Sequence, residues 1–418
     1  MNKKMKIAVV GIGQRGQELI PHSILPACEE YNVEVAAVCD FYEDRTAIGA
    51  ELVEKATGKA PLQAKSYDEI LGMPDIDGII ISSSWETHAE MAIAAMKVGK
   101  FPAFEVGGVY TLEDCWRLVD TCEETGVPCM MLENCCYGQR ELLALNMMRQ
   151  GLFGDVVHCS GGYHHDLRKE ISNGRENRHY RLRNYVNRNC ENYPTHELGP
   201  IAKLLDINNG NRMVSLTSVA SSSKGLHEYV VREKGADDPL AKIEFAQSDI
   251  VTTIIKCAKG QTIVLTLDTT LPRAYARNFT VRGTKGSYFD GTDSVFFDGI
   301  HNEFEWSAYK LWGNVKEYID KYQHPLWKDY VPKGGHDGMD YMVISAYLES
   351  LTTGNRPPID VYDAASLMCI SVLSEQSIQK GGAPVTIPDF TRGKWYMRDD
   401  ISDSKYDLDR RDVFEGIY

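Results

Sequence analysis

IAVVGIGQRG, which runs from Ile7 to Gly16, joins a short apolar segment to a glycine-rich turn. The residues Ile7–Val10 are continuously apolar, as in a parallel strand that is covered on both faces. The glycines follow the spacing GxGxxG directly after that strand and open a helical stretch. In this context the spacing predicts a turn whose backbone N–H groups bind a pyrophosphate at a helix N-terminus.

An acidic residue stands where such a turn needs a partner for the adenosine ribose. Asp40 ends the second predicted strand, Val33–Cys39. A carboxylate there accepts hydrogen bonds from the ribose hydroxyls and repels the 2′-phosphate of NADP, so the sequence predicts NAD as the cofactor. Arg45 follows closely and leaves binding of that phosphate open as an alternative.

The rest of the first third alternates strands and helices. Further apolar runs are Gly78–Ser82, Phe101–Glu105 and Val127–Glu133. Three helical stretches begin with a hydroxyl residue that an acid follows three positions later, the pattern of a capping box. These pairs are Ser66 with Glu69, Thr87 with Glu90, and Thr111 with Asp114. The alternation predicts an α/β Rossmann domain, a doubly wound parallel sheet, over residues 1–135.

From about residue 151 the strands follow one another without helices between them. The predicted strands are Asp155–Gly161, Met213–Ala220, Ile250–Ala258, Gln261–Asp268 and Phe279–Arg282. Two helices are expected later, over Asp340–Leu351 and Asp363–Lys380. The sequence therefore predicts a second domain over residues 136–418, an α+β fold with an open, mainly antiparallel sheet. A charged segment, Lys394–Tyr418, closes the chain.

The composition narrows the classes of partner. The chain has 418 residues, 43% of them hydrophobic, which is enough for two domains with sizeable cores. Its formal net charge of -14 disfavours nucleic acid as a partner. No apolar run approaches the roughly 20 residues of a membrane helix, and the N-terminus does not read as an export signal, so we expect a cytoplasmic protein. The 11 cysteines show no zinc-binding spacing, so we expect reduced thiols.

Other segments carry a resemblance to a known family. Ser82–His88 follows a strand and opens a helix, while Glu105 and Asn134 end later strands. This order is similar to the glucose–fructose oxidoreductase, inositol dehydrogenase and MocA family, whose members add an open sheet to a Rossmann domain. The resemblance implies that NAD is bound by Gly11, Gly13, Gln14, Arg15, Gly16, Asp40, Ser83, Trp85, His88, Glu105 and Asn134.

A narrower resemblance rests on four separate segments. They are Glu133–Tyr137, Gly162–Arg168, Asn192–Pro200 and Gly334–Asp340. All four are similar to glycoside hydrolase family 109, whose members are NAD-dependent α-N-acetylgalactosaminidases and their relatives. Val106 replaces the lysine that often assists the related dehydrogenases, which favours the glycosidases. The chain departs from family 109 at Gly107, usually proline, and at Glu197, usually glycine.

The resemblance also implies a mechanism on a small-molecule glycoside. NAD oxidises carbon 3 of the sugar, a base removes the proton on carbon 2, the aglycone leaves by elimination, water adds and the hydride returns. His196 and Tyr193 are the implied proton-transfer groups, and Tyr163 is a candidate base at carbon 2. A histidine suits proton transfer near neutral pH. The expected substrate contacts are His164, Asn192, Glu105, Tyr137, His336 and Arg181.

Several alternatives remain at the level of residues. His196 could be a hydrogen-bonded core histidine, and Tyr163 could pack in a surface loop. Five arginines between Arg175 and Arg188 either recognise the sugar or a charged aglycone, or form a solvated or subunit-facing loop. His336 either reaches into the site or is structural. Asn192 and His196 are four residues apart and would share one face if both were helical.

Alternatives also remain at the level of function. The chain could be an NAD-dependent sugar or cyclitol dehydrogenase, including one that forms a 3-keto glycoside, or a non-catalytic sugar sensor. Adjacent histidines on an extended chain point to opposite sides, so His164 and His165 predict no metal site. Relatives are commonly oligomers, so a homodimer or homotetramer is expected.

Overall fold

The structure is a computed structural model that describes residues 4–398 and 402–409. The chain divides into two compact units, each built from separated stretches of sequence. Of the described residues, 4–137, 329–365 and 402–409 form the first unit, and 138–328 and 366–398 form the second. The chain thus leaves the first unit after Tyr137 and later returns to it.

A six-stranded parallel sheet forms the centre of the first unit, in the order β3-β2-β1-β4-β5-β6. Its strands are β1 Met5–Val10, β2 Val33–Cys39, β3 Leu62–Gln63, β4 Gly78–Ile81, β5 Phe101–Phe104 and β6 Met130–Met131. The predicted doubly wound parallel sheet is confirmed. Val10 pairs with Ile81, so the turns after β1 and β4 leave the sheet side by side.

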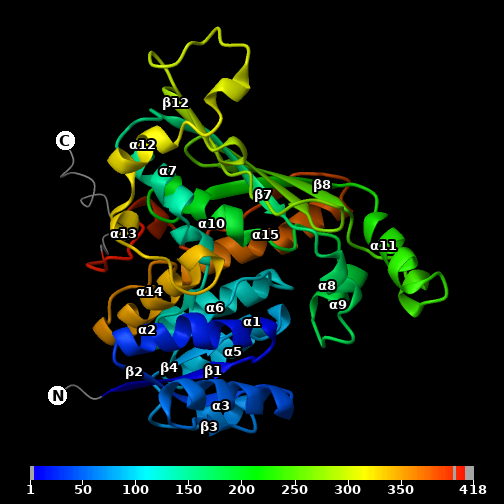
Figure 1. Ribbon diagram of the computed structural model, residues 1–418, viewed down its shortest axis with the longest axis vertical. Helices are drawn as coiled ribbons and strands as arrows, with labels where there is room; N and C mark the ends of the chain where they lie inside the picture. Colours follow the sequence, from blue (N-terminus) through cyan, green and yellow to red (C-terminus); the bar gives the residue numbers. More distant parts are fainter. Residues whose placement is uncertain (1–3, 399–401, 410–418) are drawn as a thin grey trace. The chain divides into compact units, whose positions relative to one another are not determined.

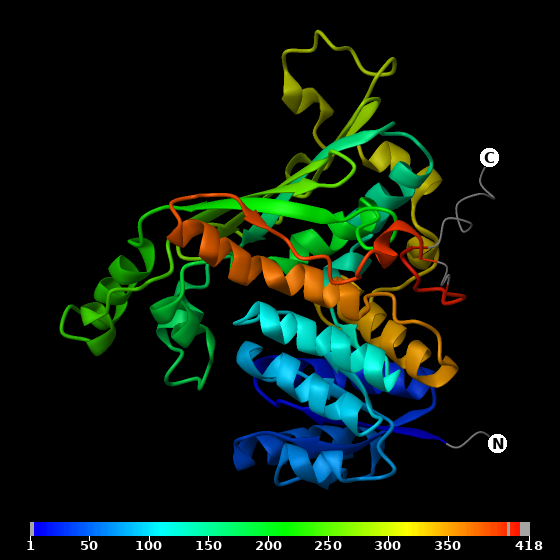
Figure 2. The same ribbon diagram turned by 180° about the vertical axis from the view of Figure 1, so that it is seen from behind.

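Helices cover both faces of this sheet (Figures 1 and 2). They are α1 Gln14–Leu19, the π-helix η1 Ile20–Ile24, α2 Leu25–Glu30, α3 Glu43–Thr57, α4 Tyr67–Leu71, α5 Trp85–Lys97, α6 Leu112–Thr125 and the 3₁₀ helix η2 Asn134–Tyr137. The returning chain adds η6 His336–Gly338 and α14 Met339–Thr353, and α14 packs against α2. The predicted helix over Asp340–Leu351 is therefore part of the first unit.

Two of the three predicted helix caps form. The Ser66 hydroxyl accepts from the Glu69 N–H at 3.2 Å, and Thr111 forms a complete capping box with Asp114. The cap predicted at Thr87 was wrong, because α5 begins two residues earlier, behind Ser84. Thr87 lies inside the helix, and its hydroxyl donates to the Ser84 carbonyl at 2.8 Å, a local bond that competes with capping.

An eight-stranded sheet forms the second unit, in the order β13-β12-β11-β7-β10-β9-β8-β14. The strands are β7 Val156–His164, β8 Met213–Ala220, β9 Ile250–Cys257, β10 Thr262–Asp268, β11 Thr280–Gly283, β12 Gly286–Phe289, β13 Ser294–Phe297 and β14 Val385–Thr386. β7 and β10 run parallel, and the other neighbouring strands of this sheet are antiparallel. The predicted mainly antiparallel sheet is confirmed.

Helices α7, α10 and α15 lie along one face of this sheet (Figures 1 and 2). The helices placed in or around this unit are α7 Gln139–Arg149, α8 Arg168–Ser172, α9 Arg181–Asn187, α10 Thr195–Leu204, α11 Gly225–Lys234, α12 Lys316–Tyr322, α13 Pro325–Lys328 and α15 Val361–Gln379, with 3₁₀ turns η3 Pro239–Lys242, η4 Asp290–Thr292, η5 Ala308–Leu311 and η7 Lys394–Tyr396. α10 packs closely on β7, because a Cβ atom on Gly161 would lie 3.0 Å from Glu197 Oε2.

Other expectations concern the chain as a whole. All 11 cysteines lie within the described residues and carry free thiols. Among residues 4–398 and 402–409, no helix is both long enough and apolar enough to span a bilayer. The charged segment predicted over Lys394–Tyr418 falls partly outside the described residues, but Tyr406 and Leu408 within it are buried.

Candidate functional site

The glycine-rich turn after β1 accepts glycine alone at two of its positions. Gly11 has a φ of +90°, and a Cβ atom there would lie 2.4 Å from the Ser82 carbonyl carbon. A Cβ atom on Gly16 would lie 2.1 Å from the Gly11 oxygen, so α1 can approach the turn only without a side chain. Gly13 faces open space apart from Arg45 Nη1, which would lie 3.6 Å from its Cβ atom. A phosphate group could approach the backbone at Gly13.

Asp40 is held beside this turn by two backbone hydrogen bonds. Its Oδ2 accepts from the Ile12 N–H at 2.6 Å and its Oδ1 from the Tyr42 N–H at 2.9 Å. Each carboxylate oxygen has more than one lone pair and can still accept from a ribose hydroxyl. Arg45 lies over the Tyr42 ring at 4.9 Å from its centroid.

The segment after β4 contains a buried tryptophan and a buried histidine, Trp85 and His88. His88 is buried, its Nε2 lies 3.0 Å from the Ser83 carbonyl oxygen, and burial lowers its pKa to about 4. His88 is therefore neutral at pH 7. A Cβ atom on Gly107 would lie 2.3 Å from Trp85 Cδ1, so a proline there would require the buried indole of Trp85 to shift.

A charged network joins the turn to the returning chain. Arg15 donates through Nη1 and Nη2 to the two carboxylate oxygens of Asp340, each at 2.8 Å. Arg15 Nη2 also lies 3.2 Å from Glu105 Oε1. Asn134 donates through Nδ2 to Asp340 Oδ1 at 2.7 Å, and His336 Nδ1 lies 2.8 Å from Asp340 Oδ2. His336, predicted to contact the substrate, thus lies beside Asp340 in the first unit.

The network lowers the pKa of Asp340 and raises the pKa of His336. Burial opposes ionisation of Asp340, but hydrogen bonds from Arg15 and His336 hold the pKa of its carboxyl well below the ordinary value. The hydrogen bond to Asp340 raises the pKa of His336. Sequence reasoning missed Asp340 as a functional candidate, although the motif Gly334–Asp340 contains it.

These residues fit a bound dinucleotide. Asn134 Oδ1 is buried and has no hydrogen-bond donor among the described residues, so it offers an acceptor to an amide. Asp40 offers acceptors to a ribose, and Gly13 leaves room for a pyrophosphate. The first unit therefore offers acceptors for an amide and a ribose, and space for a pyrophosphate.

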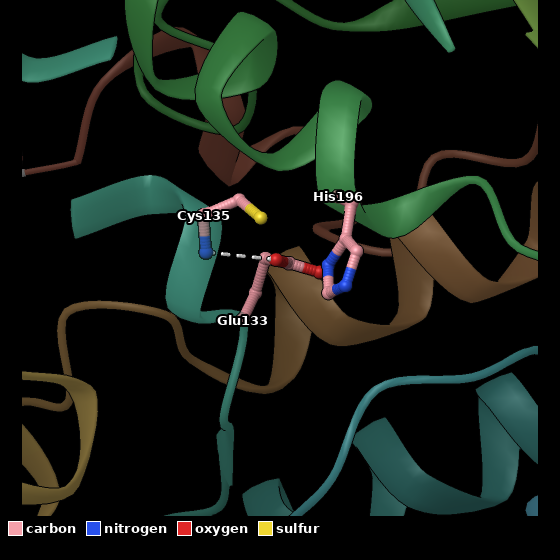
Figure 3. A group of neighbouring side chains, drawn as sticks. All are labelled: Glu133, Cys135 and His196. Atoms are coloured by element: carbon pink, nitrogen blue, oxygen red, sulfur yellow. Dashed lines mark hydrogen bonds between the residues drawn. The ribbon is translucent and has the colours of Figure 1, made fainter. Parts of the chain in front are cut away.

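The segment Glu133–Tyr137 forms a compact edge of the first unit. The Glu133 carboxylate accepts from the Cys135 N–H at 3.1 Å, which Figure 3 shows. Tyr137, predicted to contact the substrate, is fully buried and donates from its hydroxyl to the Tyr406 carbonyl at 3.1 Å. The structure thus places Tyr137 in the core.

A cluster of tyrosines and histidines gathers in the second unit, and we call it the tyrosine–histidine cluster: Tyr163, His165, Tyr193, His196 and Tyr275. The Tyr193 ring centroid lies 4.3 Å from that of Tyr163 and 4.8 Å from that of His196. The Tyr163 hydroxyl lies 3.0 Å from His165 Nδ1, and the ring centroids of Tyr275 and His165 are 5.2 Å apart. The three predicted catalytic residues therefore lie together.

Alternation along β7 decides which histidine joins the cluster. Tyr163 and His165 lie two residues apart and face the same side, while His164 points to the other side and its Nδ1 lies 3.0 Å from Asn278 Nδ2. Burial lowers the pKa of His165, so its neutral imidazole can accept a hydrogen bond from Tyr163 at pH 7. Sequence reasoning missed His165 and Tyr275. For His165 the two-residue alternation was an available signal.

Two predicted substrate contacts flank the cluster. The Arg181 guanidinium lies over the Tyr193 ring at 4.9 Å from its centroid, and Arg181 Nε lies 2.8 Å from Glu170 Oε1. Asn192 donates through Nδ2 to Gln247 Oε1 at 3.0 Å. The expectation that Asn192 and His196 share a helix face was wrong, because α10 begins only at Thr195. Pro194 disfavours a helical conformation for the residue before it.

Two protein-family descriptions match the chain, and together they cover most of it. The family description "Glycosyl hydrolase 109, C-terminal domain" matches residues 137–397. The chain belongs to glycosyl hydrolase family 109. Residues 5–133 of this family 109 protein match "Oxidoreductase family, NAD-binding Rossmann fold". The chain is thus an enzyme that combines an NAD-binding fold with a glycosyl hydrolase domain.

Curated relatives extend over nearly the whole family 109 chain. A "Glycosyl hydrolase family 109 protein" of Stenotrophomonas maltophilia is 39% identical, with 97% of this chain and 93% of that protein covered. An "Alpha-N-acetylgalactosaminidase" of Tannerella forsythia is 38% identical, with 94% and 88% covered.

Solved structures support the fold. A levoglucosan dehydrogenase in complex with NADH and levoglucosan matches with a TM-score of 0.69 at 17% identity, covering 92% of this chain and all of that one. An inositol dehydrogenase homologue from Azotobacter vinelandii, in complex with NADH and myo-inositol, matches with a TM-score of 0.63 at 16% identity, covering 93% and 98%. At these identities the likeness establishes the two-domain architecture.

Proposed function

We propose that this chain is an NAD-dependent glycosidase that cleaves an α-N-acetylgalactosaminide without net oxidation. Relatives from Tannerella forsythia and Shewanella oneidensis, at 38% and 37% identity, bear the name alpha-N-acetylgalactosaminidase. The tyrosine–histidine cluster carries the proposal, because it gathers groups that can move protons within the part of the chain matched by the hydrolase family.

Bound NAD would supply a hydride acceptor for carbon 3 of the sugar and return the hydride later in the same turnover. The chain's own residues bind the cofactor, orient the sugar and move protons. In the proposal, Gly13 leaves space for the pyrophosphate, Asp40 accepts from the ribose and Asn134 Oδ1 accepts from the amide.

The tyrosine–histidine cluster divides the proton transfers. His196 accepts the proton of the carbon 3 hydroxyl. Tyr163 removes the proton at carbon 2, and His165, 3.0 Å from its hydroxyl, accepts the phenolic proton. Arg181 places positive charge over the Tyr193 ring. The absence of a lysine at Val106 argues against a simple dehydrogenase, in which that lysine would assist the removal of the hydroxyl proton.

The test uses the purified chain with p-nitrophenyl α-N-acetylgalactosaminide, with NAD added or removed. We expect release of nitrophenol without accumulation of NADH, and incorporation of solvent deuterium at carbon 2 of the sugar. His196→Gln should lower kcat/KM by about 10²- to 10⁴-fold, the usual contribution of a proton-transfer group. The control is His227→Gln on the exposed face of α11, which should leave kcat/KM unchanged.

Other outcomes would overturn the proposal. Accumulation of one NADH for each sugar consumed would identify a sugar or cyclitol dehydrogenase instead. Turnover without deuterium at carbon 2 would exclude the elimination route.

A further inference from the structure

Apart from His336, which is an expected substrate contact, the motif Gly334–Asp340 has no role in the chemistry described so far. It lies in the first unit, where the chain returns from the second, and forms η6 and the first turn of α14. Its last residue, Asp340, has a side chain only 1% exposed and makes four hydrogen-bond contacts. A buried carboxylate with this many partners requires an explanation.

Arg15 is the main partner of Asp340. The guanidinium and the carboxylate meet as a two-pronged pair, with both N···O distances at 2.8 Å. Arg15 lies between Gly13 and Gly16 of the glycine-rich motif, in the first turn of α1. Glu105 Oε1 lies 3.2 Å from Arg15 Nη2 on another side of the same guanidinium.

Asn134 is the second partner, and its orientation depends on Asp340. Because Asn134 donates through Nδ2 to Asp340 Oδ1, its own Oδ1 points away and remains a buried acceptor without a donor among the described residues. The carboxylate therefore determines which end of the Asn134 amide is offered to a ligand.

A metal ion is a weaker explanation for this cluster. Glu18, His336 and Asp340 place ligand atoms close enough together to hold one. However, Arg15 Nη1 lies 2.8 Å from Asp340 Oδ2, 3.3 Å from His336 Nδ1 and 3.9 Å from Glu18 Oε2. The guanidinium already supplies the positive charge that these groups surround.

We propose that Asp340 is a positioning residue for NAD: it fixes Arg15 in the glycine-rich turn and turns the carbonyl of Asn134 toward the cofactor. The inference rests on the proposed NAD-dependent function. Asp340 touches neither the sugar nor the reacting atoms in this proposal, and acts through Arg15 and Asn134. Its position in the sequence, far beyond the N-terminal sheet, makes the returning chain a part of the nucleotide site.

A double-mutant cycle on the full chain tests the link, with the dissociation constant of NAD measured by calorimetry without substrate. Asp340→Asn replaces one carboxylate oxygen by an amide NH₂ group, which cannot accept the hydrogen bonds that this oxygen receives. The substitution should therefore weaken NAD binding about tenfold or more. Arg15→Met should also weaken it. We expect the double variant to have about the same dissociation constant for NAD as whichever single variant binds NAD more weakly. Both substitutions break the same contact, the one between Arg15 and Asp340.

Asp337→Asn is the matched control, since it removes an exposed acid from the same loop at a φ of 54°, which asparagine tolerates. It should leave the dissociation constant unchanged. The proposal is overturned if folded Asp340→Asn binds NAD within twofold of the wild type, or if the two effects simply add. If Asp340→Asn does not fold, unchanged NAD affinity in Arg15→Met overturns it. Failure of the wild type to bind NAD would instead refute the proposed function.

Discussion

Glu191 is a fully buried carboxyl group two residues before Tyr193 of the tyrosine–histidine cluster. Its backbone N–H donates to Ser374 Oγ at 2.9 Å, and its Oε2 has no hydrogen-bond donor among the described residues. Burial raises the pKa of Glu191 to about 8, and a hydrogen bond from the Tyr193 N–H opposes this only in part. At neutral pH the folded protein therefore favours the protonated carboxyl.

The raised pKa predicts a pH-dependent cost in stability. Between the ordinary pKa of 4.5 and about 8, the folded chain binds a proton at Glu191 that the unfolded chain releases. The free energy of unfolding contributed by this group therefore falls as the pH rises through that range. Glu191→Gln does not titrate and keeps an acceptor for Tyr193. Its stability relative to the wild type should rise by roughly 3 kcal/mol between pH 5 and pH 8.

Urea denaturation at both pH values measures this difference. Glu124→Gln on the exposed side of α6 is the control and should show no such change. A Glu191→Gln difference that is the same at pH 5 and pH 8 would contradict the raised pKa.

Helix starts show how far a local pattern predicts an element. α5 and α6 both begin after a hydroxyl residue, yet only one of these residues caps its helix through its side chain. Thr111 accepts from the Asp114 N–H at 3.1 Å, whereas the Ser84 hydroxyl makes no such bond. A hydroxyl residue at the N-cap is therefore not sufficient for side-chain capping, and Thr87 with Glu90 shows that a hydroxyl followed by an acid three positions later is not sufficient either.

The two caps predict different mutational effects. Thr111→Ala should reduce the free energy of unfolding by about 1 kcal/mol, because it leaves an N–H of the first turn unsatisfied. Ser84→Ala should cost clearly less. The midpoints of urea unfolding at constant slope measure both values. Equal losses for the two variants would contradict the expectation that the capping box of α6 adds stability that α5 lacks.

At the scale of the whole molecule, the N-terminal sheet packs against α14, a helix that comes much later in the chain. The Tyr347 hydroxyl of α14 donates to the Phe101 carbonyl at 2.8 Å, and a Cβ atom on Gly78 would lie 2.3 Å from that hydroxyl oxygen. The Tyr347 ring packs edge-on against Phe101 at 4.9 Å between centroids. The first unit is thus incomplete without α14.

A fragment of residues 1–137 tests this dependence. It should unfold at a lower temperature and less cooperatively than the first unit in the full chain, because it exposes the surface that α14 buries. Circular dichroism melting curves of both proteins provide the measurement. A sharp transition in the fragment at the temperature of the full chain would contradict the expectation.

The homodimer or homotetramer expected from relatives stays a prediction.

Local physical constraints in the sequence were sufficient to predict the glycine-rich turn, the parallel sheet and the mainly antiparallel second sheet. The backbone at Gly11 and Gly16 admits no side chain, and buried strands require continuous apolar runs, so both leave a readable pattern. The grouping of Tyr163, Tyr193 and His196 was anticipated through family resemblance.

The meeting of Arg15 with Asp340 left no such pattern, because a contact between residues so far apart depends on how helices pack and not on local periodicity. For the same reason the contact of His336 with Asp340 was not anticipated, while its contact with the substrate stays a prediction. The place of Tyr275 in the cluster, with its ring centroid 6.2 Å from that of Tyr163, likewise depends on the tertiary structure of the second unit. Backbone geometry depends on a few neighbouring residues and therefore leaves a local pattern in the sequence. Side-chain partners depend on how distant segments of the chain pack together, which leaves no such pattern.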